Sequence, residues 1–183
     1  MTATADGARE ILDFWFREVG PERWWTRSAE TDAAIRERFL VLWEAWRTRP
    51  ADHFLGTADK ALAAVVLFDQ YSRNMFRGEA RAFATDPLAL AIALGAIDRG
   101  FDARLNADER SFLYLPFQHS EDLPMQDRAV VLFEALGLAG PIDYAHRHHA
   151  MIARYGRFPA RNAALGRPDR PGEAEAIAAS ADW

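Results

Sequence analysis

The sequence contains no cysteine and a single lysine, Lys60, among its 183 residues. The absence of cysteine excludes disulfides, thiolate metal sites and cysteine nucleophiles, and it makes the reducing cytoplasm the expected compartment. The amino-terminal residues MTATADGARE have neither a basic start nor an apolar stretch, so we expect no secretory signal.

Long apolar runs are also missing. The longest, at 61–68 and 88–97, fall well short of the roughly 20 residues that a membrane helix needs. The net charge of −5 and the pI of about 5.5 argue against a nucleic acid or an anionic membrane as a partner. The length and the 50% apolar composition fit one folded domain over residues 1–183.

No segment alternates apolar and polar residues as a half-buried strand does, whereas apolar residues recur at spacings of three and four along most of the chain. We therefore predict an all-α fold of stacked antiparallel helical hairpins. The segment 57–71 is apolar nearly all round, which predicts a central helix buried on several sides. A turn-rich linker at 166–172 precedes a short tail helix within 172–183. The other predicted helices cover 11–19, 30–46, 86–99, 106–118, 120–136 and 141–155.

Several polar residues are expected to cap these helices. Asn106 with Glu109 three residues later is typical of a helix start, and Ser120 is a candidate N-cap for the next helix. Asp86 before Pro87 reads as a capping carboxylate followed by a proline in the first turn.

Two basic segments stand out in an otherwise acidic chain. Residues 147–170 hold six arginines against one acid, and residues 70–81 hold three arginines against one acid. Guanidinium groups bind phosphate or carboxylate through two parallel hydrogen bonds, so the two segments could converge on one anion. Equally, the arginines could cap helix ends and pair with carboxylates such as Asp69, Glu79 and Asp86. The candidate anion ligands are Arg73, Asn74, Arg77, Arg157, Arg161 and Asn162.

His119 is the candidate proton-transfer residue. Imidazole titrates near neutral pH, and Glu121 two residues later could orient and charge it as an acid/base partner. Ser120 between them is better explained as a helix cap than as a nucleophile.

The histidines near the end of the chain could in principle hold a metal. They do not have the spacing of known zinc motifs, and no phosphate loop, dinucleotide turn or nucleophile elbow is present. We therefore expect no metal and no cofactor. Among the tryptophans, Trp15, Trp43 and Trp46 fit apolar helix stripes, while Trp24 and Trp25 lie in a short polar connection. The metal candidates considered are Asp143, His146, His148 and His149.

Four blocks in register together resemble the bacterial DUF924 family. They are ILDFWF at 11–16, FDQYSRNMFRG at 68–78 with AFATD at 82–86, the stretch 113–122, and RYGRFP at 154–159 followed by Arg161 and Asn162. The resemblance implies an all-helical, tetratricopeptide-like superhelical fold and supplies no activity. One departure is Ser72, where the family pattern leads us to expect proline.

The family pattern also adds Asp69 to the candidate ligand-binding residues. The leading hypothesis is a helical domain that binds a small phosphate or carboxylate in an arginine-rich pocket, with His119 and Glu121 as the acid/base pair if it is an enzyme. The alternatives are a groove that binds a peptide or chain end, and an internal network of ion pairs without a ligand. The sequence predicts no oligomeric state.

Overall fold

The computed structural model describes residues 3–179, and every regular element in that range is helical, which confirms the all-α prediction. Six one-turn 3₁₀ or π segments connect or extend the α-helices. The α-helices are α1 (Ala3–Asp13), α2 (Ala29–Trp46), α3 (Ala58–Val65), α4 (Ser72–Met75), α5 (Asp86–Asp98), α6 (Ala107–Gln118), α7 (Leu123–Leu136), α8 (Ala139–Tyr155), α9 (Asn162–Leu165) and α10 (Glu173–Ala179).

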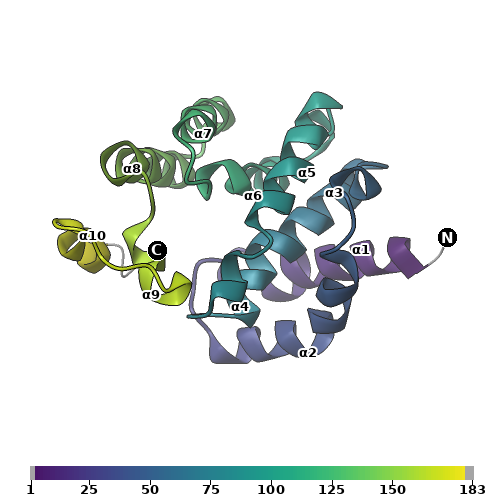
Figure 1. Cartoon of the computed structure of the whole chain (residues 1–183). Helices are drawn as coiled ribbons and strands as arrows, with labels where there is room; N and C mark the ends of the chain where they lie inside the picture. The colour runs from purple at the N-terminus through teal and green to yellow at the C-terminus, as the bar shows by residue number, and fades with distance from the viewer. Residues whose placement is uncertain (1–2, 180–183) are drawn as a thin grey trace.

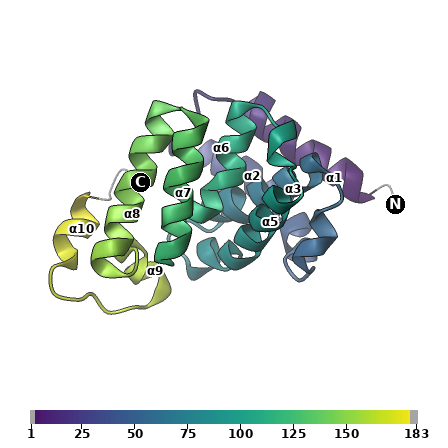
Figure 2. The same cartoon turned by 90° about the horizontal axis from the view of Figure 1, so that it is seen from above.

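Helix packing differs between the two halves of the chain. In the amino-terminal half α1 packs on α3, α2 packs on the π-helical turn Val66–Tyr71 and on α4, and α5 packs on α3 and α6. The helices α6, α7 and α8 then follow one another side by side (Figures 1 and 2). This arrangement fits the predicted helical hairpins; the finer tetratricopeptide-like superhelix stays an expectation.

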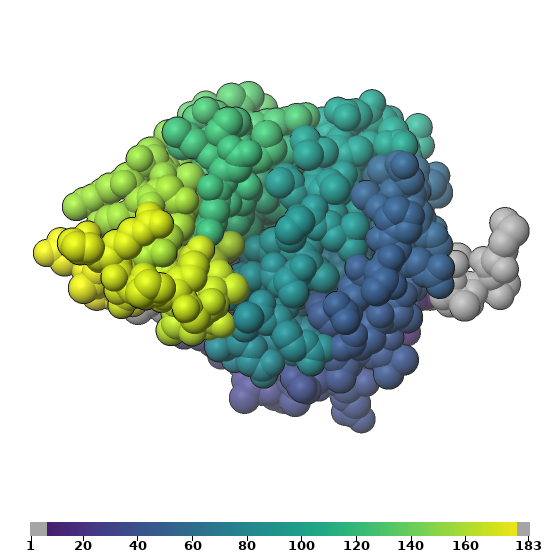
Figure 3. Space-filling model, viewed as in Figure 1, coloured from purple at the N-terminus to yellow at the C-terminus, as the bar shows by residue number. Residues whose placement is uncertain are grey.

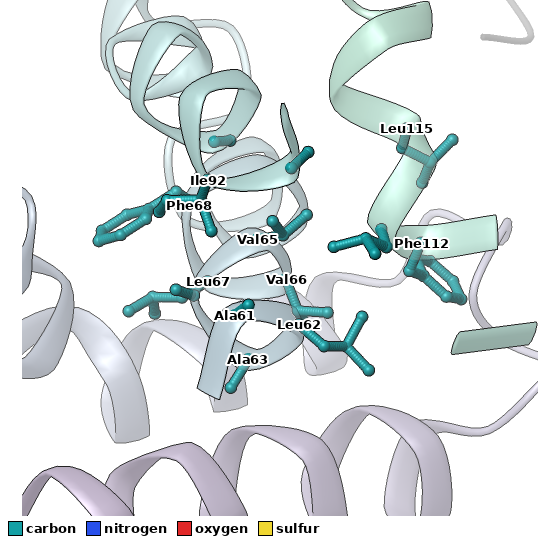
Figure 4. Close-up of a cluster of buried hydrophobic side chains, with 14 of the residues drawn as sticks. Ala61, Leu62, Ala63, Val65, Val66, Leu67, Phe68, Ile92, Phe112 and Leu115 are labelled. Carbon is teal, nitrogen blue, oxygen red and sulfur yellow. The ribbon is translucent and has the colours of Figure 1, made fainter. Parts of the chain in front are cut away.

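The helix α3 lies at the centre, as its all-round apolar sequence predicts. It continues without a break through a π-helical turn, η3 (Val66–Tyr71), into α4, and all residues from 61 to 72 are buried. Figure 4 shows the side chains of this helix pointing in several directions, with Ile92 of α5 and Phe112 and Leu115 of α6 around it. A helix surrounded in this way has no polar face, which explains its composition.

Two buried hydrogen bonds fix the helices around this centre. The Tyr71 hydroxyl donates to the backbone carbonyl of Ile11 at 3.0 Å, and Trp43 Nε1 donates to Ser72 Oγ at 2.8 Å. Ser72 therefore stands inside a continuous helix and supplies the acceptor for a buried indole, which a proline at this position could not do.

The capping predictions had mixed outcomes. Asn106 and Glu109 form the predicted capping box at the start of α6. Ser120 was placed wrongly: α7 begins after Asp122, and the Ser120 hydroxyl accepts from the Asp122 N–H in the preceding turn. Asp86 was also wrong as a cap, because Thr85 precedes the helix and the Asp86 carboxylate binds two arginines instead.

Among the described residues, one segment, Ala80–Asp98, is long and apolar enough by composition to cross a membrane. It contains α5, whose buried residues Ala89, Ile92, Ala93 and Ala96 face the core, and it carries the ion-paired Asp86. These contacts are those of a core helix.

The predicted linker ends in α10, which packs on the 3₁₀ turn η6 (Pro159–Arg161). The Arg157 guanidinium binds the Glu173 carboxylate with two hydrogen bonds of 2.8 and 2.6 Å, and Arg167 pairs with Glu121. The carboxy-terminal segment, yellow in Figure 3, lies beside the green part of the chain in this view. The predicted tail helix extends to Ala179, and residues 180–183 of that prediction lie outside the described part.

Candidate functional site

A buried carboxylate, Asp69, anchors the candidate site. It lies in the π turn η3, and its side chain is only 1% exposed. Its two oxygens accept hydrogen bonds from His119 Nδ1 at 2.8 and 3.0 Å and from Gln70 Nε2 at 2.6 Å. Single π turns inside α-helices are frequent at functional sites, because they change the direction of side chains locally.

The charges around Asp69 keep it ionised. Burial alone would raise the pKa of its carboxyl group, but Arg73 and His119, together with the hydrogen bonds from His119 and Gln70, hold that pKa well below its usual range. Arg73 Nη1 lies 3.3 Å from Asp69 Oδ1 and also donates to the Asp69 backbone carbonyl.

His119 ends α6 and is oriented by this carboxylate. Because a carboxylate can only accept, Nδ1 carries the proton, and the neutral ring keeps a lone pair on Nε2. Within residues 3–179 no hydrogen bond reaches Nε2, and the side chain is 14% exposed, so solvent reaches the ring. Burial lowers the pKa of His119, although Asp69 opposes that shift. The imidazole is therefore neutral at pH 7.

Two arginines from distant parts of the chain meet at Asp86. Arg73 binds both oxygens of Asp86, at 2.9 and 3.0 Å. Arg161 reaches the same carboxylate at 3.3 Å and donates to the backbone carbonyl of His119 at 2.9 Å. The site thus joins η3 and α4, the start of α5, the end of α6 and η6.

The positive charge of Arg161 is less well compensated by nearby carboxylates than that of Arg73. Burial and the nearby charge of Arg73 lower the pKa of Arg161 to about 10. Its guanidinium carbon lies 4.8 Å from the ring centroid of Phe83 and 4.5 Å from that of Phe158. The two rings hold the guanidinium in place through its faces.

The other predicted ligands lie in separate ion-pair clusters. Asn74 and Arg77 both donate to Asp32 of α2. Arg157 and Asn162 both donate to Glu173. Within residues 3–179, Arg73 and Arg161 are therefore the candidate ligands through which the two basic segments meet.

Glu121, the predicted partner of His119, has partners of its own. It accepts two hydrogen bonds from Arg167, at 2.7 and 3.0 Å, and one from the backbone N–H of Phe158 at 2.8 Å. Burial would raise the pKa of Glu121, but these hydrogen bonds lower it. The carboxylate that binds His119 is Asp69 instead.

Sequence reasoning missed two participants. Asp86 was predicted both as a helix cap and, in the ion-pair alternative, as a partner of the arginines, and the structure shows it bound to Arg73 and Arg161. Glu173 lies beyond the turn-rich linker, where no motif marks it. His148 was considered only as a metal ligand, yet its ring lies 6.1 Å from that of His119 and 5.2 Å from Phe158.

The four metal candidates of α8 have different partners. His149 binds Asp127, His146 binds Glu134, and Asp143 pairs with Arg147, while His148 Nδ1 donates to the Tyr144 carbonyl. In residues 3–179 no group of three or more acidic or histidine side chains lies close enough to hold a metal ion.

The comparisons with known proteins agree with the resemblance seen in the sequence. A family model described as "Bacterial protein of unknown function (DUF924)" matches residues 11–180. A solved structure, that of the protein of unknown function ATU0120 from Agrobacterium tumefaciens, is 41% identical, with a TM-score of 0.88. The match covers 94% of this chain and 97% of that one. A search of curated proteins found no match.

Proposed function

This chain belongs to the DUF924 family, and since the family has no known function, we propose from the geometry of its site that the protein binds a small phosphate or carboxylate anion beside His119. Arg73 and Arg161 would hold the anion, and the Asp69–His119 pair would exchange a proton with it. The observation that carries this proposal is the meeting of two guanidiniums with a histidine whose Nε2 has no hydrogen bond within the described residues.

The uneven pairing of the two arginines supports an anion site. Both arginines bind the Asp86 carboxylate. Arg73 donates two hydrogen bonds to it, whereas Arg161 makes a single longer contact. The two positive charges at this carboxylate repel each other. The pKa of Arg161 is lowered by burial and by this repulsion from Arg73. A bound anion could accept the forked hydrogen bonds that guanidinium offers, above all from Arg161, which has the single longer contact with Asp86.

The histidine supports a chemical role in addition to binding. Asp69 fixes the ring and its tautomer, as a buried carboxylate does for a catalytic histidine, and leaves the basic nitrogen unoccupied. The lowered pKa of His119 keeps that nitrogen available at neutral pH. The pair Asp69–His119 is thus better placed for acid/base work than the pair His119–Glu121, because Glu121 is bound to Arg167. The compartment we propose is the cytoplasm, in keeping with a cysteine-free chain.

Calorimetric titration of the full chain with inorganic phosphate, and separately with acetate, tests the proposal at constant ionic strength and pH 7. Arg161→Gln should weaken binding about tenfold or more, because a charge-assisted contact contributes roughly 1.5–3 kcal/mol. Arg77→Gln is the matched control, since its ion pair with Asp32 lies outside the site. Absence of binding by the wild type, or equal affinities of wild type and Arg161→Gln, would refute the proposal.

A further inference from the structure

A cavity that shares no lining residue with the His119 site lies between the first interhelical connection and the starts of α6 and α8. Its volume is about 360 Å³, within the range of small-molecule sites. Its lining residues are Pro21, Trp24, Trp25, Asp108, Ser111, Phe112, Leu138, Ala139, Gly140 and Pro141.

One side of the cavity is aromatic. Trp25 stacks on Phe112 with ring centroids 5.5 Å apart and planes 7° apart, and Trp24 meets Phe112 edge to face at 4.9 Å. Trp24 is fixed by a hydrogen bond from its Nε1 to the Trp15 carbonyl, whereas Trp25 is 64% exposed. A flat apolar group would pack against these rings and cover Trp25.

The polar lining residues lack partners. Ser111 is only 4% exposed, yet within residues 3–179 its hydroxyl makes no hydrogen bond. In the same part of the chain, the Asp108 carboxylate has neither an ion pair nor a hydrogen bond. Because Ser111 lines the cavity, its hydroxyl is available to form a hydrogen bond with a ligand there.

The start of α8 gives the cavity a partly positive side, opposite in sign to the Asp108 carboxylate. Its first residues, Ala139 and Gly140, line the cavity, and the first N–H groups of a helix have no acceptor within that helix. No side chain caps α8, and its first turn contains no acidic residue to balance the positive end of the helix dipole.

From these features we infer that the cavity binds a zwitterionic molecule with a flat apolar group, that is, an aromatic α-amino acid. The ammonium group would pair with Asp108 and lie near the tryptophan rings, which attract cations. The carboxylate would accept from the start of α8, and Ser111 would complete the polar contacts. The aromatic ring of the ligand would cover Trp25.

Three ligands test the contributions of the ligand's ammonium and carboxylate groups separately. L-phenylalanine has both, phenethylamine lacks the carboxylate, and 3-phenylpropanoate lacks the ammonium group. None of them emits when tryptophan is excited at 295 nm, so the tryptophan fluorescence of the full chain reports binding. We expect saturable binding of L-phenylalanine that is about tenfold or more tighter than that of either analogue, because each analogue loses one charge-assisted contact.

Asp108→Asn should weaken the binding of L-phenylalanine about tenfold and leave the affinity for 3-phenylpropanoate unchanged. Asp59→Asn is the matched control, since Asp59 occupies the corresponding second position of α3 and lies outside the cavity. Calorimetric titration should detect no binding of L-phenylalanine by Trp25→Ala.

The inference fails if no saturable binding of L-phenylalanine is found, if either analogue binds as tightly as L-phenylalanine, or if Asp108→Asn behaves like Asp59→Asn. Arg161→Gln should bind L-phenylalanine like the wild type, so this test is independent of the phosphate titration.

Discussion

Acidification from pH 7 to pH 5 should destabilise the folded chain by about 2 kcal/mol through His148 alone. This histidine is 8% exposed, donates from Nδ1 to the Tyr144 carbonyl and packs against the ring of Phe158. Burial, with a further contribution from His119, lowers the pKa of His148 to about 3.

The direction of this change in stability follows from the pKa values of His148 in the folded and the unfolded chain. An unfolded histidine titrates near 6.5, so between that value and about 3 the unfolded chain binds a proton that folded His148 does not. Stability therefore falls as the pH falls, and the contribution of His148 is fully present only above pH 6.5. The loss approaches its full value of about 5 kcal/mol below pH 3, at 1.36 kcal/mol for each pKa unit.

Urea unfolding at pH 7 and at pH 5 measures this difference directly. His148→Gln should reduce the pH-dependent loss of stability by about 2 kcal/mol. His119, whose pKa is lowered in the same direction, should account for part of what remains. The control His146→Gln removes a half-exposed ring and keeps both buried histidines. If His148→Gln loses as much stability as the wild type between the two pH values, His148 does not stay neutral in the folded chain and the reasoning is wrong.

Three further outcomes can be checked. Ser72→Ala should lower the free energy of unfolding by about 1–3 kcal/mol, measured in urea, because buried Trp43 Nε1 loses its acceptor. Arg73→Gln should cost about 3–5 kcal/mol, since buried Asp69 loses its nearest cation and Asp86 keeps only the longer contact with Arg161, whereas the exposed Arg77→Gln should change stability by less than about 0.5 kcal/mol. Glu173→Gln should speed proteolysis at 166–172. The Arg157 hydrogen bond lowers the pKa of Glu173 to about 2, so in the wild type this stabilisation is present above pH 4.5 and is lost as the pH falls towards 2.

Local patterns predicted the fold well because they depend on neighbours in the chain. The apolar segment 61–68 could only form a buried helix, and Asn106 with Glu109 marks a helix start through contacts three residues apart. The ends of other elements were less predictable: Ser120 and Asp122 can both begin a helix, and the choice between them depends on tertiary packing.

The site was predictable in its residue types and less so in its pairing. Arg73, Arg161 and His119 were chosen as chemistry-bearing residues, and the structure brings them together. Asp69 and Asp86 were named as possible arginine partners. Their pairing with His119 and Arg161 could not be read from spacing, because Asp69 lies 50 residues before His119 and Asp86 lies 75 residues before Arg161. Near neighbours such as Glu121 were the natural expectation, yet the helix end turns His119 towards the central helix.

Nitrogen-15 NMR of the His119 imidazole tests the central claim most directly, with the signal assigned by its loss in His119→Asn. At pH 7 a neutral ring with its proton on Nδ1 is predicted, and inorganic phosphate should shift the Nε2 resonance saturably in the wild type and much less in Arg161→Gln. A ring protonated on Nε2, or an Nε2 resonance that phosphate leaves unchanged, would contradict an anion site at Arg73, Arg161 and His119.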